Sequence, residues 1–165
     1  MRIEFPFNPE KAAAVVEHLA GRADENSVAT LAYIAERDHF LMYGRPICGG
    51  ELIAGAPGPA ARRVRVRGRI PVAAPVGGGS VPELTADEIR TLDAVLARAE
   101  ELLRTARELP EYREAYVPGA EAPIPYELIL RHHGGERGFR LGRPVISPET
   151  AAAMKRPFPA SEPDL

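Results

Sequence analysis

The helix expected over residues 28–43 constrains the fold more than any other segment. Projected at about 100° per residue, its apolar side chains gather on one arc: Val28, Leu31, Ile34, Ala35, Leu41 and Met42. Tyr33 and Phe40 fall on the opposite side. A helix that is apolar on two sides is usually central to its domain. Gly44 and Pro46 end it, because glycine readily takes the left-handed conformation after a helix and proline prevents continuation.

Asp38 lands near the middle of the main apolar arc. An unpaired charge buried there is very costly, so the pattern predicts a partner for it. We expect Asp38 to accept hydrogen bonds from a nearby backbone N–H or from Arg45, and so to organise the Gly-Arg-Pro turn. A catalytic carboxylate is the alternative. Glu36 and His39, spaced i, i+3, indicate a surface ion pair rather than a shared metal or proton.

Two further helices have clear start signals. Asn8 followed by Pro9 is typical of an N-cap and a first helical residue. Thr85 and Glu88 have the spacing of a capping box, and an apolar stripe continues from there to about Arg107. Shorter helices are expected within residues 108–117 and 126–131. Glycines that follow His132 and His133 end the second helix. These two histidines are expected to form a solvated helix end.

These patterns predict a mainly helical α+β domain. Four to five helices would surround the central helix, residues 26–43, with a small β-hairpin or sheet built from residues 50–72. A turn is expected at Gly58-Pro59. We expect one domain, residues 1–143, and a proline-rich, flexible C-terminal tail, residues 144–165.

Residues 62–72 alternate arginines with mostly apolar residues, which predicts a strand with one cationic face. The side chains of that face would project about 7 Å apart: Arg63, Arg65, Arg67 and Arg69. Three interpretations stay open: a charged edge strand protected against aggregation, a surface for an acidic protein partner, and a contact to nucleic-acid phosphates. Tyr33 and Phe40 either pack inside or add to a partner-binding patch.

The composition narrows the class of protein. The net charge of −2 argues against a generally cationic nucleic-acid binder. Cys48 is the single cysteine, so an internal disulfide is excluded and a reducing, cytoplasmic location is expected. We see no signal peptide and no apolar run that could cross a membrane. No residue pattern indicates a cofactor, and the adjacent histidines do not have the spacing of a zinc site.

The arrangement resembles the Panacea domain of SocA-like antitoxins. That family shows L-x-Y-x-A-[DE]-R-x-H, then Y-G-R-P-I, then G-x-x-x-x-A and a G-P turn. The matching segments here are Leu31 to His39, Tyr43 to Ile47, Gly50 to Ala54, and Gly58-Pro59. The segment LTADEIRTLDAVLAR is similar to the family's second helix. The resemblance covers roughly residues 8–117. Its structural motif residues are Asp38, Gly44, Arg45, Pro46, Gly58 and Pro59.

The resemblance implies a non-catalytic function. Such proteins neutralise a cognate bacterial toxin by binding it, and the SocA type is similar to an adaptor that delivers its toxin to the ClpXP protease. Two alternatives from other classes remain open. One is a small metal-dependent hydrolase or nuclease that uses His39, His132 and acidic neighbours. The other is a nucleic-acid-binding regulator that uses the arginine-rich segment.

Overall fold

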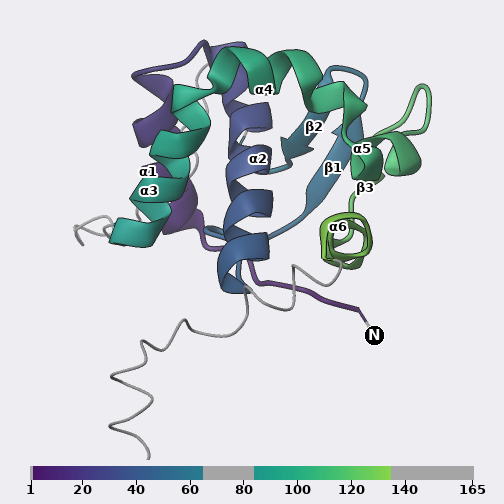
Figure 1. Cartoon of the computed structure of the whole chain (residues 1–165), viewed down its shortest axis with the longest axis horizontal. Coiled ribbons are helices and arrows are strands. Elements are labelled where there is room, and N and C mark those ends of the chain that lie inside the picture. The colour runs from purple at the N-terminus through teal and green to yellow at the C-terminus, as the bar shows by residue number, and fades with distance from the viewer. Residues whose placement is uncertain (1, 65–83, 135–165) are drawn as a thin grey trace, which may run out of the picture.

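The computed structural model describes residues 2–64 and 84–134. These residues form six α-helices, one 3-10 helix and three strands (Figure 1). The helices are α1 (Pro9–Ala20), α2 (Glu25–Tyr43), α3 (Ala86–Ala97), α4 (Ala99–Thr105), η1 (Ala106–Glu108), α5 (Pro110–Ala115) and α6 (Tyr126–His133). The strands are β1 (Leu52–Gly55), β2 (Gly58–Ala61) and β3 (Ala122–Pro123). The mainly helical α+β class is therefore confirmed.

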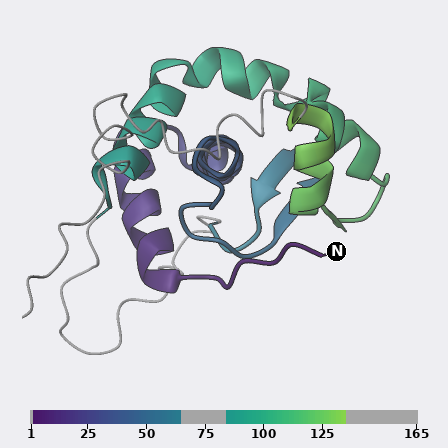
Figure 2. The ribbon, with the colours of Figure 1, turned by 60° about the horizontal axis from the view of Figure 1, so that its bottom comes forward.

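Helix α2 is the centre of the domain. Seen end-on in Figure 2, it lies between α1 and α3 on one side and the small sheet on the other, while α3 and α4 arch over it. The expected helix from Thr85 to about Arg107 is interrupted at Arg98, where φ is −119° and ψ is 18°. Five α-helices lie around α2 in the described part of the chain, which agrees with the predicted four to five.

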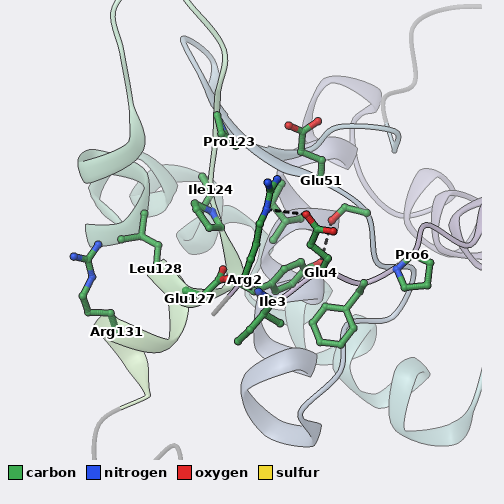
Figure 3. Close-up of a pocket in the computed structure, with 15 residues that line it drawn as sticks. Arg2, Ile3, Glu4, Pro6, Glu51, Pro123, Ile124, Glu127, Leu128 and Arg131 are labelled. Atoms are coloured by element: carbon green, nitrogen blue, oxygen red, sulfur yellow. Dashed lines mark hydrogen bonds and ion pairs between the residues drawn. The ribbon is translucent and has the colours of Figure 1, made fainter.

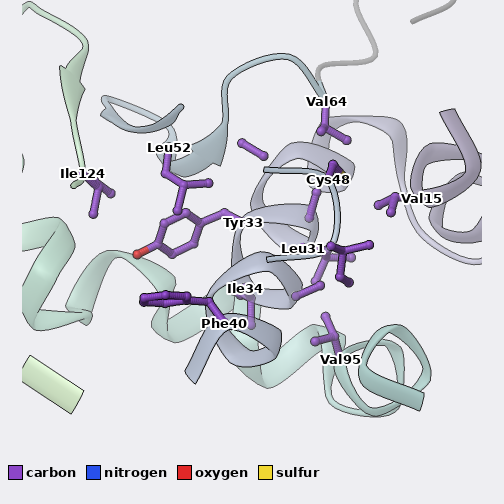
Figure 4. Packing of buried hydrophobic residues seen from close by; sticks show 14 of the residues in the cluster. Val15, Leu31, Tyr33, Ile34, Phe40, Cys48, Leu52, Val64, Val95 and Ile124 are labelled. Atoms are coloured by element: carbon purple, nitrogen blue, oxygen red, sulfur yellow. The ribbon is translucent and has the colours of Figure 1, made fainter. Parts of the chain in front are cut away.

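The core covers both sides of α2. Side chains from all the surrounding elements pack around Leu31, Ile34 and Tyr33 (Figure 4). Tyr33 is 0% exposed and Phe40 5% exposed. The ring of Phe40 packs edge-to-face on Phe5 and Tyr126, at centroid distances of 5.6 and 4.9 Å. The sheet and the N-terminal segment cover this second apolar side of α2. The interpretation of Tyr33 and Phe40 as a partner-binding patch is therefore wrong, and the packing alternative holds.

The sheet is antiparallel, with strand order β2-β1-β3. Strands β1 and β2 form a hairpin within the predicted region 50–72, but the tight turn lies at Ala56-Pro57 and not at Gly58-Pro59. Gly58 pairs with Gly55, and Pro59 pairs with Ala54 inside the ladder. Proline fits there because β2 is an edge strand, which can turn the missing N–H away from its neighbour. The Gly58-Pro59 turn is thus corrected to a strand start.

The arginine-rich segment differs from its predicted strand where the structure describes it. Strand β2 ends at Ala61, and residues 62–63 form a turn. Arg62 forms an ion pair with Glu51, and the exposed Arg63 lies over the ring of Phe7, 5.0 Å from its centroid. Arg65, Arg67 and Arg69 lie outside the described residues, as does the predicted tail at 144–165.

The capping box at the start of α3 is confirmed. The hydroxyl of Thr85 accepts from the backbone N–H of Glu88 at 3.2 Å, and the Glu88 carboxylate accepts from the N–H of Thr85 at 2.8 Å. Glu88 is buried and also binds Lys11, at 2.5 Å, and Arg45, at 3.2 Å. The cap therefore joins the start of α3 to α1 and to the loop after α2.

Replacing Thr85 by alanine should lower the free energy of unfolding by about 1 kcal/mol, the usual loss for an N-cap hydroxyl. Thr105→Ala is the matched control, because the Thr105 hydroxyl only donates to a carbonyl of its own exposed helix. Thermal unfolding followed by circular dichroism measures both variants. Equal shifts in melting temperature would contradict a specific role for the cap.

Candidate functional site

The loop that follows α2 is fastened by a buried carboxylate from the middle of that helix. The Glu36 oxygens accept hydrogen bonds from the backbone N–H groups of Ile47, Cys48 and Gly49, at 2.9, 2.8 and 3.3 Å. Glu36 is 1% exposed. Burial raises the pKa of Glu36, and the hydrogen bonds from Cys48 and its neighbours oppose that rise. Burial likewise raises the pKa of the Cys48 thiol, so this cysteine is a packing residue.

Asp38 does not take the role predicted for it. Its side chain is 37% exposed and pairs with Arg37 at 2.8 Å, whereas Arg45 binds Glu88. Residues two apart on a helix point about 200° apart, and the loop returns along the side that carries Glu36. Glu36, and not the expected Asp38, is therefore the hydrogen-bond acceptor for this loop. The expected surface ion pair between Glu36 and His39 is wrong, because both side chains are buried and bind the backbone of this loop instead.

His39 fixes the other end of the same loop. Its Nδ1 donates to the carbonyl oxygen of Arg45 at 2.7 Å, while Gly44 takes the predicted left-handed conformation with φ of 75°. Burial lowers the pKa of His39, and its Nε2 has no hydrogen-bond partner in the described part of the chain. His132, the second histidine of the hydrolase alternative, instead contacts Glu114 at 2.7 Å. Within residues 2–64 and 84–134, no three His, Cys, Asp or Glu side chains are grouped to hold a metal ion.

A buried ionic cluster joins α2, α5 and α6, and the sequence patterns did not predict it. Glu111 is 0% exposed. One of its oxygens accepts from the Tyr33 hydroxyl at 3.0 Å and from Arg37 at 3.3 Å, and the other contacts His133 Nε2 at 2.6 Å. The expectation of a merely solvated helix end is therefore wrong for His133, whereas His132 is exposed there. The partners lie up to 78 positions apart, so no local spacing could have revealed the cluster.

A groove opens between the N-terminal segment and α6 (Figure 3). Its volume is about 1360 Å³. Residues 2–6 form one wall, residues 50–52 form the floor, and residues 123–128 with Arg131 form the other wall. The apolar lining comes from Ile3, Phe5, Leu52, Ile124, Tyr126 and Leu128. The charged lining comes from Arg2, Glu4, Glu51, Glu127 and Arg131. Apolar walls with a charged rim are suited to binding another molecule.

The groove depends on the loop that Glu36 holds. The N–H of Gly50 donates to the carbonyl of Phe5 at 3.0 Å, and the N–H of Asn8 donates to the carbonyl of Cys48 at 2.8 Å. At Gly49, a β-carbon would lie 2.5 Å from the carbonyl oxygen of Pro6, and the φ of 72° also favours glycine. The Glu36 carboxylate therefore positions the N-terminal wall of the groove through residues 48–50.

No family model, no curated protein and no solved structure matches this chain. The resemblance to the Panacea domain therefore stays a prediction made from the residues. In the described part of the chain, no helix combines the length and the apolar character needed to cross a bilayer. The described residues form a scaffold with a groove that is partly apolar and partly charged.

Proposed function

We propose that this chain is an antitoxin-like protein that binds and neutralises a cognate bacterial toxin, and that the groove is its binding surface. The observation that carries the proposal is the connectivity of the residues that resemble the Panacea pattern. Glu36 holds the backbone at 47–49, His39 holds the Arg45 carbonyl, and Tyr33 and Arg37 share Glu111. The residues of this sequence pattern thus hold the same loop or share one partner. Such residues form one structural unit, which is what we expect of a domain motif.

The groove adds a surface that suits a protein partner. Its apolar lining provides contact area, and the carboxylates and arginines at its rim provide orientation and selectivity. Members of the family that this chain resembles neutralise toxins that are proteins. We therefore expect a peptide segment of the toxin to occupy the groove. Neutralisation would then follow from covering the toxin's working surface or from carrying the toxin to a ClpXP-type protease.

The deciding experiment uses the reading frames that adjoin this gene. We expect that one neighbour encodes a protein that stops growth when expressed alone, and that co-expression of this chain restores growth. The two proteins should co-purify as one complex. Growth arrest without rescue by this chain, together with no co-purification with any neighbour, would overturn the proposal.

Blocking and delivery give different toxin lifetimes. In a host that lacks ClpX, a toxin neutralised by blocking remains harmless and is present at an unchanged level when this chain is expressed. A toxin neutralised by delivery accumulates and becomes harmful again. A pulse-chase measurement of the toxin, with and without ClpX, separates the two modes.

Two measurements address the competing classes of function. Stoichiometric zinc or manganese in the purified protein would favour the metal-dependent hydrolase or nuclease over the antitoxin. DNA binding that weakens steeply with salt would favour the nucleic-acid-binding regulator, because release of counterions from phosphates gives that dependence. We expect neither result for a protein that acts by binding a toxin.

A further inference from the structure

The groove walls carry several hydrogen-bond acceptors beside their two arginines, Arg2 and Arg131. Three of the residues that line it are prolines, which have a carbonyl but no N–H: Pro6, Pro123 and Pro125. Three others are glutamates: Glu4, Glu51 and Glu127. A molecule that brings donors can pair with the acceptors that are left without a partner.

Glu127 differs from the other two glutamates in its partners. Glu4 pairs with Arg2 at 2.7 Å, and Glu51 pairs with Arg62. In Glu127, Oε1 accepts from the backbone N–H of Ile3, while Oε2 is buried and has no hydrogen-bond partner among the described residues. Figure 3 places Glu127 between α6 and the Arg2–Ile3 end of the N-terminal segment. A donor that meets this oxygen from the groove would give it a partner, which is favourable because a buried acceptor without a partner is costly.

The arginines nearby do not satisfy this acceptor. Arg131 lines the same wall but binds Glu114 at 2.5 Å, and the Arg2 guanidinium is taken by Glu4. Apolar and aromatic residues also line this groove, and two of them, Phe5 and Tyr126, pack edge-to-face at 4.9 Å. Such a lining suits the aliphatic stem of a lysine or arginine, whose charged end then reaches the carboxylate.

We propose that the groove binds a basic segment of the partner protein, in which one arginine or lysine places its cationic group on Glu127 and apolar neighbours contact the groove walls. The inference rests on the proposed function only for the identity of the partner, the toxin. The chemistry of the occupant rests on the groove alone. Glu127 is thus a specificity residue of the binding surface.

The test uses two short fluorescent peptides, one of alternating leucine and arginine and one of alternating leucine and glutamate. Fluorescence anisotropy gives the dissociation constant of each with the full chain. We expect the arginine peptide to bind at least about tenfold more tightly than the glutamate peptide, a difference of about 1.4 kcal/mol, and its binding to weaken as salt is added.

Glu127→Gln keeps the shape of the side chain and removes its charge. We expect it to weaken binding of the arginine peptide by about tenfold, the order of loss for a charge-assisted hydrogen bond. Glu4→Gln is the matched control in the same groove, because Glu4 is exposed and already paired, and it should change binding less than about twofold. Circular dichroism and melting temperature confirm that both variants fold.

Several outcomes would overturn the proposal. Equal binding of the two peptides, no binding of either, or equal effects of Glu127→Gln and Glu4→Gln would each contradict it. Tighter peptide binding after replacement of Arg65, Arg67 and Arg69 by serine would show that the chain's own arginines fill the groove, which contradicts a partner segment. Self-association that Glu127→Gln abolishes would contradict it in the same way, in favour of a second copy.

The two proposals fail separately. If the arginine peptide binds through Glu127 but no neighbouring gene product is neutralised, the groove chemistry stands and the antitoxin function falls. If a toxin is neutralised equally well by wild type and Glu127→Gln, and the peptides bind equally, the antitoxin function stands and the basic occupant falls.

Discussion

Replacing Glu36 by glutamine is expected to lower the free energy of unfolding by about 3 kcal/mol. The two carboxylate oxygens accept three backbone N–H groups, from Ile47, Cys48 and Gly49. Glutamine offers one oxygen and turns an NH₂ group toward donors, so at least one of these donors loses its partner inside the protein. Urea unfolding followed by circular dichroism measures the loss. Hydrogen exchange should show faster exchange at the amides of these three residues.

Asp38→Asn is the matched control on the same helix. Its carboxylate is 37% exposed and bonded to Arg37, so we expect a loss below about 1 kcal/mol. The two substitutions make the same chemical change two residues apart, and only the environment differs. A loss at Asp38 as large as the loss at Glu36, or unchanged exchange at residues 47–49 in the Glu36 variant, would contradict the assignment of the loop to Glu36.

The features that the sequence predicted well are local. The Asn8 side chain accepts from the N–H groups of Glu10 and Lys11, at 3.1 and 3.0 Å. The capping box of Thr85 forms within one helical turn, and Gly44 ends α2 in the left-handed conformation. Each of these depends on residues no more than four positions apart, so a short stretch of sequence contains all the information needed.

The path of the loop back along α2 depends on the tertiary structure and not on neighbouring residues. The prediction for Asp38 was wrong for this reason. The helical projection identified two apolar sides of α2 but not which side faces the loop at 47–49. Apolar neighbours favoured Asp38 as the buried carboxylate, whereas Glu36 was assigned to a surface ion pair. The turn at Gly58-Pro59 failed for a related reason. Glycine and proline also suit the start of an edge strand, and the ladder with β1 decides between the two.

The groove and the buried cluster were beyond sequence reasoning because each is assembled from distant segments. Residues 2–6, 50–52 and 123–131 meet only when the sheet has formed. Glu111, Arg37 and His133 come from three helices. The sequence contained one signal of the cluster, because Tyr33 and Arg37 lie one turn apart on the same side of α2. A buried tyrosine hydroxyl beside a guanidinium needs an acceptor, and a carboxylate from another segment could provide it.

The buried cluster predicts a loss of stability in acid that depends on Glu111. Burial alone raises the pKa of this carboxyl, but the hydrogen bond from His133 and the charges of His133 and Arg37 outweigh it and lower the pKa to about 2. A glutamate in the unfolded chain has a pKa of about 4.3. The depressed value means that the stabilisation is complete above the unfolded pKa and is lost as the pH falls from about 4 through about 2. The stabilisation lost over this range is about 3 kcal/mol.

Glu111→Gln removes this titration, so the difference in unfolding free energy between wild type and variant should shrink by about 3 kcal/mol between pH 5 and pH 2. Other carboxylates titrate in both proteins and cancel in the difference.

Glu114→Gln is the matched control three residues further along α5. Glu114 also contacts a histidine, His132, but its side chain is 43% exposed, so its difference from wild type should change much less over the same range, because solvent screens an exposed ion pair. Urea unfolding at stepped pH measures all three proteins. A constant difference for Glu111→Gln would show that its carboxyl titrates as an ordinary glutamate, and would remove the ionic cluster as the link between α2, α5 and α6.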